Sequence, residues 1–376
     1  MSGVGIVATP DLERSFGASH ALATAVLFLV PGIVAFLVEP ILFVLADKYP
    51  RRWFIRGGVA AMAVSAVIAA LARGPVALAC ALSIMYIAVG ASSALGQATL
   101  VDGAPDARGR TIARFTLLSL AGDLAAPLLL AVLAIGGFGW RAAYAVVAVA
   151  LAIWAIGMWF ARIEGRGGGD DDDDAGPSPG VMAALKMALT DRTLLFWLFA
   201  TSLCDLLDEI LVVLASIHVR DDFGASAVWQ TATIVACVAG DVVGLLVLDR
   251  VLRTRPERTV LAWSAGACAV AYGAWLLAPT PLAGVILMVP VGVFAGPLYP
   301  LASAQAYAQR PEASGAVLAA SHLFTPLGLA LPFLLGALAD YAGSHVALAM
   351  LLVQPLGLVA LTLLSSGNKP DSRSGS

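Results

Sequence analysis

Six acidic residues stand inside long apolar stretches of this sequence, where a carboxylate has little water to solvate it. They are Glu39, Asp123, Asp205, Asp208, Glu209 and Asp241. Asp205, Asp208 and Glu209 are spaced i, i+3 and i+4, so a helix would place all three on one face. Because an ionised carboxylate in hydrocarbon is costly, acids of this kind mark ion or substrate pathways.

Proton binding is the chemistry that this pattern favours. No Lys or Arg lies near the centre of an apolar stretch, so the acids lack a fixed cationic partner. Desolvation and mutual repulsion favour the protonated form of clustered carboxyl groups, and such a face can exchange a proton for a cation. The alternative is that individual acids lie at wetted helix ends, or are neutral and hydrogen-bonded to a neighbour.

The elements that must carry these acids are membrane-spanning helices. The chain has 376 residues, of which 60% are hydrophobic and 12% charged, and its mean hydropathy is +0.89. A soluble domain needs more polar surface, so the composition indicates an all-α polytopic membrane protein. Apolar runs of about 20 residues predict eleven spans, at residues 20–45, 53–72, 76–99, 112–135, 140–161, 193–217, 227–248, 259–278, 281–305, 314–338 and 344–364.

The basic residues predict the orientation of these spans. Among the 22 Lys and Arg residues, all but four fall on one side, and the exceptions are Arg14, Arg73, Arg141 and Arg220. Positive charge collects in cytoplasmic loops, so that side is expected to be cytoplasmic. The predicted location is the cell inner (plasma) membrane, with the C-terminus in the cytoplasm.

A polar segment divides the chain between the fifth and sixth predicted spans. Residues 165–180 read GRGGGDDDDDAGPSPG, a composition that cannot bury a core and is typical of a solvated linker. A calcium or magnesium site there would need interleaved turn geometry, which the aspartate run lacks. The sequence therefore predicts an N-terminal bundle at 1–163, a cytoplasmic linker at 164–180, a C-terminal bundle at 181–366 and a cytoplasmic tail at 367–376.

The two predicted bundles carry an internal repeat. Glu39 and Asp47 are followed 202 residues later by Asp241 and Asp249, and the run from Pro105 to Gly109 returns 206 residues later as Pro311 to Gly315. Acids are rare in apolar helices, so their return at one offset favours a parallel duplication. The counterpart of the 193–217 span would then lie mostly before Met1, so we expect the first helix of the first bundle to be missing. An eleven-helix protein with its N-terminus outside is the alternative.

A short basic turn follows the first predicted span. Asp47, Lys48, Arg51 and Arg52 resemble the loop signature of the major facilitator superfamily, although Phe43 and Pro50 stand where that signature has glycines. The resemblance implies two pseudo-symmetric helical bundles that give alternating access to a central site. It also implies that this turn and its repeat at Asp249, Arg250 and Arg253 act as latches that hold one access state.

The same resemblance places the 76–99, 193–217 and 281–305 spans around the central cavity. These spans carry Gln97, Tyr299 and Gln305, which we interpret as hydrogen-bonding groups for a substrate, although each could equally pack between helices. Trp197 lies two turns from Asp205, where an aromatic ring would suit an organic cation, or it could anchor the helix at the membrane interface.

These features together predict a secondary transporter that exports an organic cation or drug-like molecule in exchange for protons. Proton-coupled uptake of a small metabolite is the main alternative, because the sequence does not give the direction. A membrane enzyme is disfavoured: the run from Asp102 to Arg108 has the wrong spacing for a phospholipid head-group transferase, and the later aspartate pair is absent. A receptor or scaffold of the same fold is disfavoured by the acids. The expected partners are a small-molecule substrate, protons and the lipid bilayer, and we expect a monomer with no cofactor, metal or nucleic acid.

Overall fold

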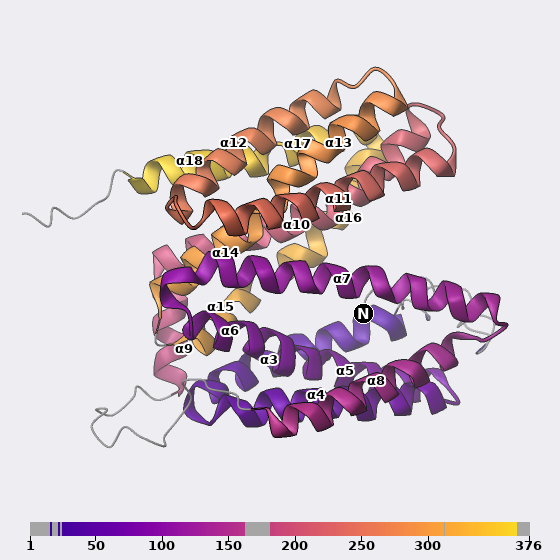
Figure 1. Ribbon diagram of the computed structural model, residues 1–376, viewed down its shortest axis with the longest axis vertical. Helices are drawn as coiled ribbons and strands as arrows, with labels where there is room; N and C mark the ends of the chain where they lie inside the picture. Colours follow the sequence, from indigo (N-terminus) through magenta and orange to yellow (C-terminus); the bar gives the residue numbers. More distant parts are fainter. Residues whose placement is uncertain (1–15, 17–21, 23–24, 162–180, 312, 367–376) are drawn as a thin grey trace, which may run out of the picture. The chain divides into compact units, whose positions relative to one another are not determined.

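The computed structural model describes residues 16, 22, 25–161, 181–311 and 313–366, which are helical apart from short turns and contain no strand (Figure 1). Short π and 3-10 segments interrupt or extend several helices. The α-helices are α3 (Val30–Lys48), α4 (Arg51–Leu71), α5 (Pro75–Val89), α6 (Leu95–Asp102), α7 (Arg108–Ile135), α8 (Trp140–Phe160), α9 (Val181–Thr190), α10 (Arg192–Asp221), α11 (Ala227–Val251), α12 (Glu257–Leu276), α13 (Pro281–Ala295), α14 (Leu298–Gln309), α15 (Ser314–Ser321), α16 (Thr325–Ala342), α17 (Ser344–Leu351) and α18 (Val353–Ser366).

The helices have the length and composition of membrane spans. Within the described residues, eight helical segments are long and apolar enough to cross a bilayer. The predicted spans at 112–135, 193–217 and 314–338 are also helical, within α7, α10 and α15–α16, but each contains positions whose side chains lie outside the described part. The all-α membrane fold is therefore confirmed, while the count of eleven spans stays a prediction.

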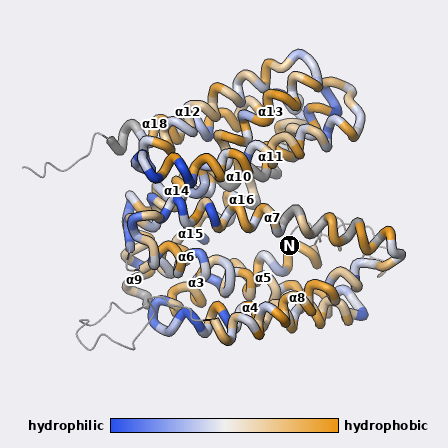
Figure 2. The backbone as a smooth tube through the Cα atoms, viewed as in Figure 1, coloured by the Kyte–Doolittle hydropathy of each residue, from blue (hydrophilic) through white to orange (hydrophobic). Residues whose placement is uncertain are grey.

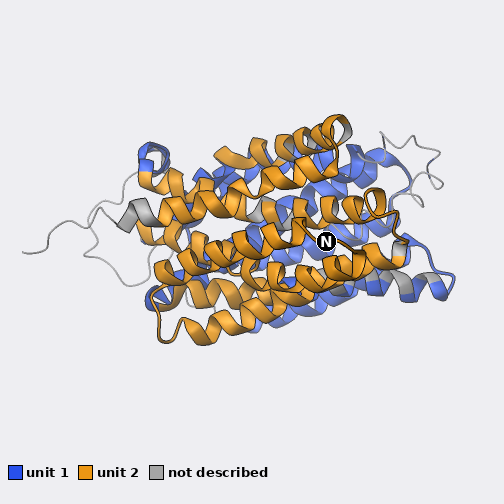
Figure 3. Ribbon diagram, turned by 90° about the horizontal axis from the view of Figure 1, so that it is seen from above, with its two compact units in different colours: residues 1–106, 118–192, 310–322 blue, residues 107–117, 193–309, 323–376 orange. Residues whose placement is uncertain are grey.

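The helices form two compact units (Figure 3). Unit 1 contains residues 1–106, 118–192 and 310–322, and unit 2 contains residues 107–117, 193–309 and 323–376. Each unit thus includes one short segment from the opposite half of the sequence. In this division α9 belongs to unit 1. The predicted linker at 164–180 and tail at 367–376 lie outside the described residues, and the predicted domain boundaries stay a prediction.

Unit 1 is held together by small and aromatic side chains between α4, α5 and α8. Ala69 of α4, Leu78 of α5 and Trp140 of α8 belong to one buried cluster. Hydrophobic residues run along the length of α4 and α8 (Figure 2), and outward-facing side chains such as Leu71 and Phe160 are exposed. A membrane protein is expected to present such side chains to lipid, because lipid tails are as apolar as these side chains.

In unit 2, glycines allow α11 and α13 to approach closely. A Cβ atom at Gly240 or Gly244 of α11 would overlap a backbone carbonyl of α13, and a Cβ at Gly292 of α13 would overlap the carbonyl of Cys237. Small residues let backbones approach in this way where lipid supplies no hydrophobic driving force between helices. The pairing fixes the position of Asp241, which lies between these glycines on α11.

Two predicted spans are interrupted at residues that lie against Glu39. The 76–99 span changes from α5 into a π-helix at Gly90–Ala94 before α6, and the 314–338 span changes from α15 into a 3-10 turn at His322–Phe324 before α16. Single π turns within α-helices are frequent at functional positions. Gly90 and His322 both contact Glu39, as described below.

Candidate functional site

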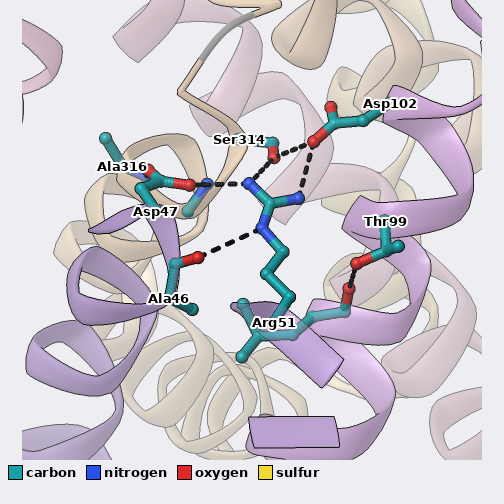
Figure 4. Close-up of polar contacts among 9 residues, drawn as sticks. Ala46, Asp47, Arg51, Thr99, Asp102, Ser314 and Ala316 are labelled. Atoms are coloured by element: carbon teal, nitrogen blue, oxygen red, sulfur yellow. Dashed lines mark hydrogen bonds and ion pairs between the residues drawn. The ribbon is translucent and has the colours of Figure 1, made fainter. Parts of the chain in front are cut away.

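A buried arginine organises one end of unit 1 (Figure 4). The Arg51 guanidinium, only 3% exposed, donates to Asp47 Oδ1 and Asp102 Oδ2, each at 2.6 Å. It also donates to Ser314 Oγ at 2.7 Å and to the Ala46 carbonyl at 3.3 Å. Ser314 Oγ in turn donates to Asp102 Oδ2 at 2.6 Å. We call these residues, with the first turn of α15, the Arg51 cluster.

Asp47 also caps the N-terminus of α15. Its Oδ1 accepts from the Gly315 amide at 2.9 Å, and its Oδ2 accepts from the Ala316 amide at 2.8 Å. These amides belong to the first helical turn, which has no intrahelical partners for them. The helix end carries about half a positive charge, so it offsets part of the negative charge that two aspartates and one arginine leave. The cluster can therefore keep these charges buried.

Unit 2 holds a related arrangement at the first turn of α7. Glu257 of α12 accepts from the Gly109 amide at 2.7 Å and from the Gln305 amide nitrogen at 3.2 Å. Asp249 of α11 pairs with Arg114 at 2.8 Å and with Arg253 at 3.2 Å. Gly109 is the repeat counterpart of Gly315. In each unit, an acid from one half of the sequence therefore accepts a hydrogen bond from the first turn of a helix in the other half.

Inside the membrane-length part of unit 1, Glu39 pairs with His322. The Nε2 atom of His322 lies 3.2 Å from Glu39 Oε2, and the two side chains are 16% and 14% exposed. Phe36 and Phe43 of α3 flank the imidazole, with ring centroids 6.4 and 5.5 Å away. Gly90 makes room for the acid, because a Cβ atom there would overlap the Glu39 carboxylate.

The repeat is visible in how the intramembrane acids pack. Asp241, 5% exposed, lies with its backbone against Gly292 and Gly296 of the 281–309 span, whereas Glu39 lies with its carboxylate against Gly90. Gly292 follows Gly90 by the same 202 residues that separate Asp241 from Glu39. In both units the helix position that carries the acid therefore lies against a glycine of another span, which supports the duplication inferred from the sequence.

The four residues predicted to contact a substrate differ in their exposure and in the groups that they contact. Gln97 of α6 is buried, Tyr299 of α14 is half-buried, and Trp197 of α10 is 1% exposed and packs edge-on against Phe196. Gln305 accepts from Arg258 Nε at 2.8 Å in the polar cluster of unit 2. The substrate role of these four residues stays a prediction.

The backbone of α10 is helical across Asp205, Asp208 and Glu209, as predicted, and α7 is helical across Asp123. The side chains of these four acids lie outside the described part of the structure, so their surroundings carry no argument. Among the predicted latch residues, Lys48, Arg52, Arg250 and Arg253 are exposed.

Several functional candidates were not recognised in the sequence. Asp102, Ser314, His322, Glu257 and Arg114 all join the polar clusters above. The repeated run ending at Gly109 and Gly315 was a signal for the two helix starts, but their partners lie more than a hundred residues away in sequence. Another unrecognised group, His218, contacts Asp222 and Ser344; burial lowers the pKa of its imidazole, although Asp222 opposes the shift.

The membrane-length helices and repeated polar clusters define a polytopic helical membrane protein of duplicated design. The chain belongs to the Major Facilitator Superfamily, whose family model matches residues 1–331. It is accordingly a secondary transporter rather than an enzyme.

Solved transporters share this fold. The chain is similar to the E. coli fucose:proton symporter FucP, with 12% identity, a TM-score of 0.70, and 96% of this chain and 94% of that chain covered. The proton:xylose symporter XylE has 14% identity and a TM-score of 0.70, with 98% and 92% covered. A bacterial homologue of the iron transporter ferroportin has 14% identity and a TM-score of 0.71, with 98% and 97% covered. At these identities the likeness establishes the fold alone. No curated protein matches the sequence.

Proposed function

We propose that the chain couples solute movement to protons and exports an organic cation or drug-like molecule across the inner membrane. The observation that carries the proposal is the pair formed by Glu39 and His322. An acid within a membrane span has as its observed partner a titratable imidazole, not a permanently charged Lys or Arg. An imidazole, unlike the side chain of Lys or Arg, is a general carrier of exchangeable protons in proteins.

Alternating access provides the mechanism. Asp47 and Arg51 hold the first turn of α15, Glu257 holds the first turn of α7, and Asp249 pairs with Arg114 in the following turn of α7. Each of these contacts joins segments that come from different halves of the sequence. Breaking and re-forming them gives the two halves discrete states, which a transporter of this kind requires. The protein would act as a monomer with the basic turns, the 164–180 linker and the C-terminus in the cytoplasm.

Proton-coupled uptake of a small metabolite is the second candidate. It is favoured by the similarity in fold to FucP and XylE, which are proton symporters for sugars. The two candidates predict opposite directions of proton movement relative to the solute.

Inside-out vesicles with an acidic lumen separate the candidates. Lipophilic cations are added in one series, and neutral sugars and organic acids in another, while a trapped dye reports luminal pH. The test variant carries Asp205→Asn, Asp208→Asn and Glu209→Gln together. The matched control is Asp221→Asn, which removes an exposed acid from the end of the same helix.

Export is supported if cations release protons from the lumen of vesicles with wild-type or Asp221→Asn protein but not with the triple variant. If a neutral or anionic solute alone moves protons, in its own direction, the uptake symporter is correct. Normal coupling in a folded triple variant would contradict the role of these three acids.

A further inference from the structure

We propose that Glu39 and His322 form a proton-binding site that controls the contact between α3 and α15, and through it the Arg51 cluster. The inference deepens the proposed function, because it assigns the coupling proton to a particular pair of side chains. The pair lies in unit 1, and the chain passes into unit 2 directly after His322. His322 is therefore the last residue of a unit 1 segment, next to the point where the chain continues into unit 2.

The surroundings of the pair favour a neutral state that holds one proton. Two phenylalanine rings flank the imidazole, and both side chains are largely buried. A lone carboxylate charge in such surroundings is costly, because burial removes the water that would solvate it. One proton shared by the pair removes the net charge, whether it is drawn as glutamic acid with neutral imidazole or as an ion pair.

The second ring nitrogen of His322 lacks a partner whether or not the pair holds its proton. Nδ1 is buried and has no hydrogen-bond partner among the described residues. In the one-proton state Nδ1 carries hydrogen and lacks an acceptor. After the proton leaves, with Nε2–H donating to Glu39, Nδ1 is a bare nitrogen that lacks a donor. A buried donor and a buried acceptor are both costly without a partner, so the charge on Glu39 determines the difference between the two states.

The pair and the Arg51 cluster lie at two points along the same helix contact. Asp47 follows Glu39 by eight residues on α3, and His322 follows Gly315 by seven residues on the α15 segment, so the two contacts are roughly 12 Å apart. Buried side chains of α3 and α15, including Phe43 and Ala319, pack between them. When the proton leaves, the uncompensated charge on Glu39 favours separation of α15 from α3. This separation also weakens the hydrogen bonds from the first turn of α15 to Asp47.

Other titratable groups on the surrounding helices are engaged elsewhere. Asp47 and Asp102 bind Arg51 at the far end of the contact, and the Tyr86 hydroxyl of α5 donates to the Leu27 carbonyl. The remaining charged or titratable groups on elements packed against α3 or α15 are Lys48 of α3, Arg52 and Arg56 of α4, Cys80 of α5 and Lys186 of α9.

The second repeat does not contain this site. Asp241 corresponds to Glu39, but the offset that aligns the start of α15 with the start of α7 places Thr116 at the position of His322. The contact between Glu39 and His322 is therefore specific to unit 1, and the imidazole–carboxylate contact of unit 2, between His218 and Asp222, lies at a different position.

Hydrogen–deuterium exchange of the full-length protein in nanodiscs, without solute, tests the site. The readout is the protection of the Gly315 and Ala316 amides, divided by intrinsic exchange rates, across about pH 5 to 8 where histidine titrates. Three variants are compared with the wild type: Glu39→Gln, Gly90→Ala and Gly96→Ala. The Gly90→Ala change pushes the carboxylate from His322 without altering either titratable group, whereas a Cβ at Gly96 meets no atom within 4 Å.

We expect wild-type protection to fall with rising pH, by up to about tenfold per pH unit for loss of one proton. Glu39→Gln should stay protected and independent of pH, Gly90→Ala should be less protected at every pH, and Gly96→Ala should match the wild type. A wild-type pH profile in Glu39→Gln, or equal profiles in the two glycine variants, would overturn the proposal. Vesicle transport measured in parallel separates the two claims: a Glu39-dependent profile without solute-driven proton movement contradicts only the proposed function.

Discussion

At the scale of the residue, burial decides which charges matter. Arg51 and its neighbour Arg52 are both arginines of the same turn, but Arg51 is 3% exposed and bound to two aspartates while Arg52 is exposed. Surface ion pairs contribute about 0–1 kcal/mol, whereas removing one partner from a buried pair leaves an uncompensated charge. Two adjacent arginines are therefore expected to contribute differently to the stability of the fold.

We expect Arg51→Gln to lower the free energy of unfolding by about 3 kcal/mol, the lower end of the range for a broken buried ion pair because Asp47 is partly solvated. The Gly315 and Ala316 amides should also exchange faster, since repulsion between Asp47 and Asp102 displaces their acceptor. Thermal unfolding and hydrogen exchange in detergent measure both effects. Arg52→Gln serves as the matched control and should change neither by much; equal effects of the two substitutions would show that the buried contacts contribute little.

The sequence alone predicted part of this site. Asp47 and Arg51 follow from charge spacing in a turn, and Glu39 from its position inside an apolar run. Their partners could not be predicted in the same way, because Ser314 and His322 are more than 260 residues from Arg51 and only the packing of α15 brings them near. A lone histidine in an apolar helix gives no local sign of the acid that it will contact.

At the scale of the element, helix contacts rather than hydropathy determine where the acids lie. Length and apolar composition predicted the spans, and helices occupy all of the predicted ranges that the structure describes. They did not predict the π turn at Gly90 or the 3-10 turn at His322. Both interruptions occur where a side chain must be accommodated, which depends on neighbouring helices and is not encoded by local periodicity.

We expect Gly244→Ala to destabilise unit 2 by about 3 kcal/mol, the upper part of the range for overpacking, because the added methyl group would overlap backbone of α13 that cannot rotate away. Thermal unfolding of purified protein measures the change. The control Gly273→Ala adds a methyl group on α12 where no atom lies within 4 Å, so it should be neutral or stabilise by up to about 1 kcal/mol through helix propensity. Equal stability of both variants would contradict close packing of α11 and α13.

At the scale of the whole molecule, the two units hold related but unequal polar clusters. In unit 1 the contacts at the start of α15 are centred on a buried arginine, while in unit 2 the two arginines that pair with Asp249 are 62% and 58% exposed. Exposed pairs are screened by salt and contribute little. The pairs made by Asp249 therefore contribute less than the buried pairs made by Arg51. Each unit also holds a carboxylate–imidazole pair, but at a different place: Glu39 with His322 in unit 1, and Asp222 with His218 in unit 2. In the proposed mechanism, this inequality gives the transporter a preferred resting state that proton binding by Glu39 and His322 shifts.

The most direct test of the account is to supply a pH gradient as the only energy source. Purified protein is reconstituted into liposomes with equal solute on both sides, and a pH gradient is imposed with the membrane potential clamped. We predict that solute moves against its developing concentration gradient, that a protonophore abolishes this movement, and that folded Glu39→Gln protein only equilibrates solute. Solute that never exceeds equilibrium in wild-type liposomes, with or without the protonophore, would contradict proton-coupled transport by this protein.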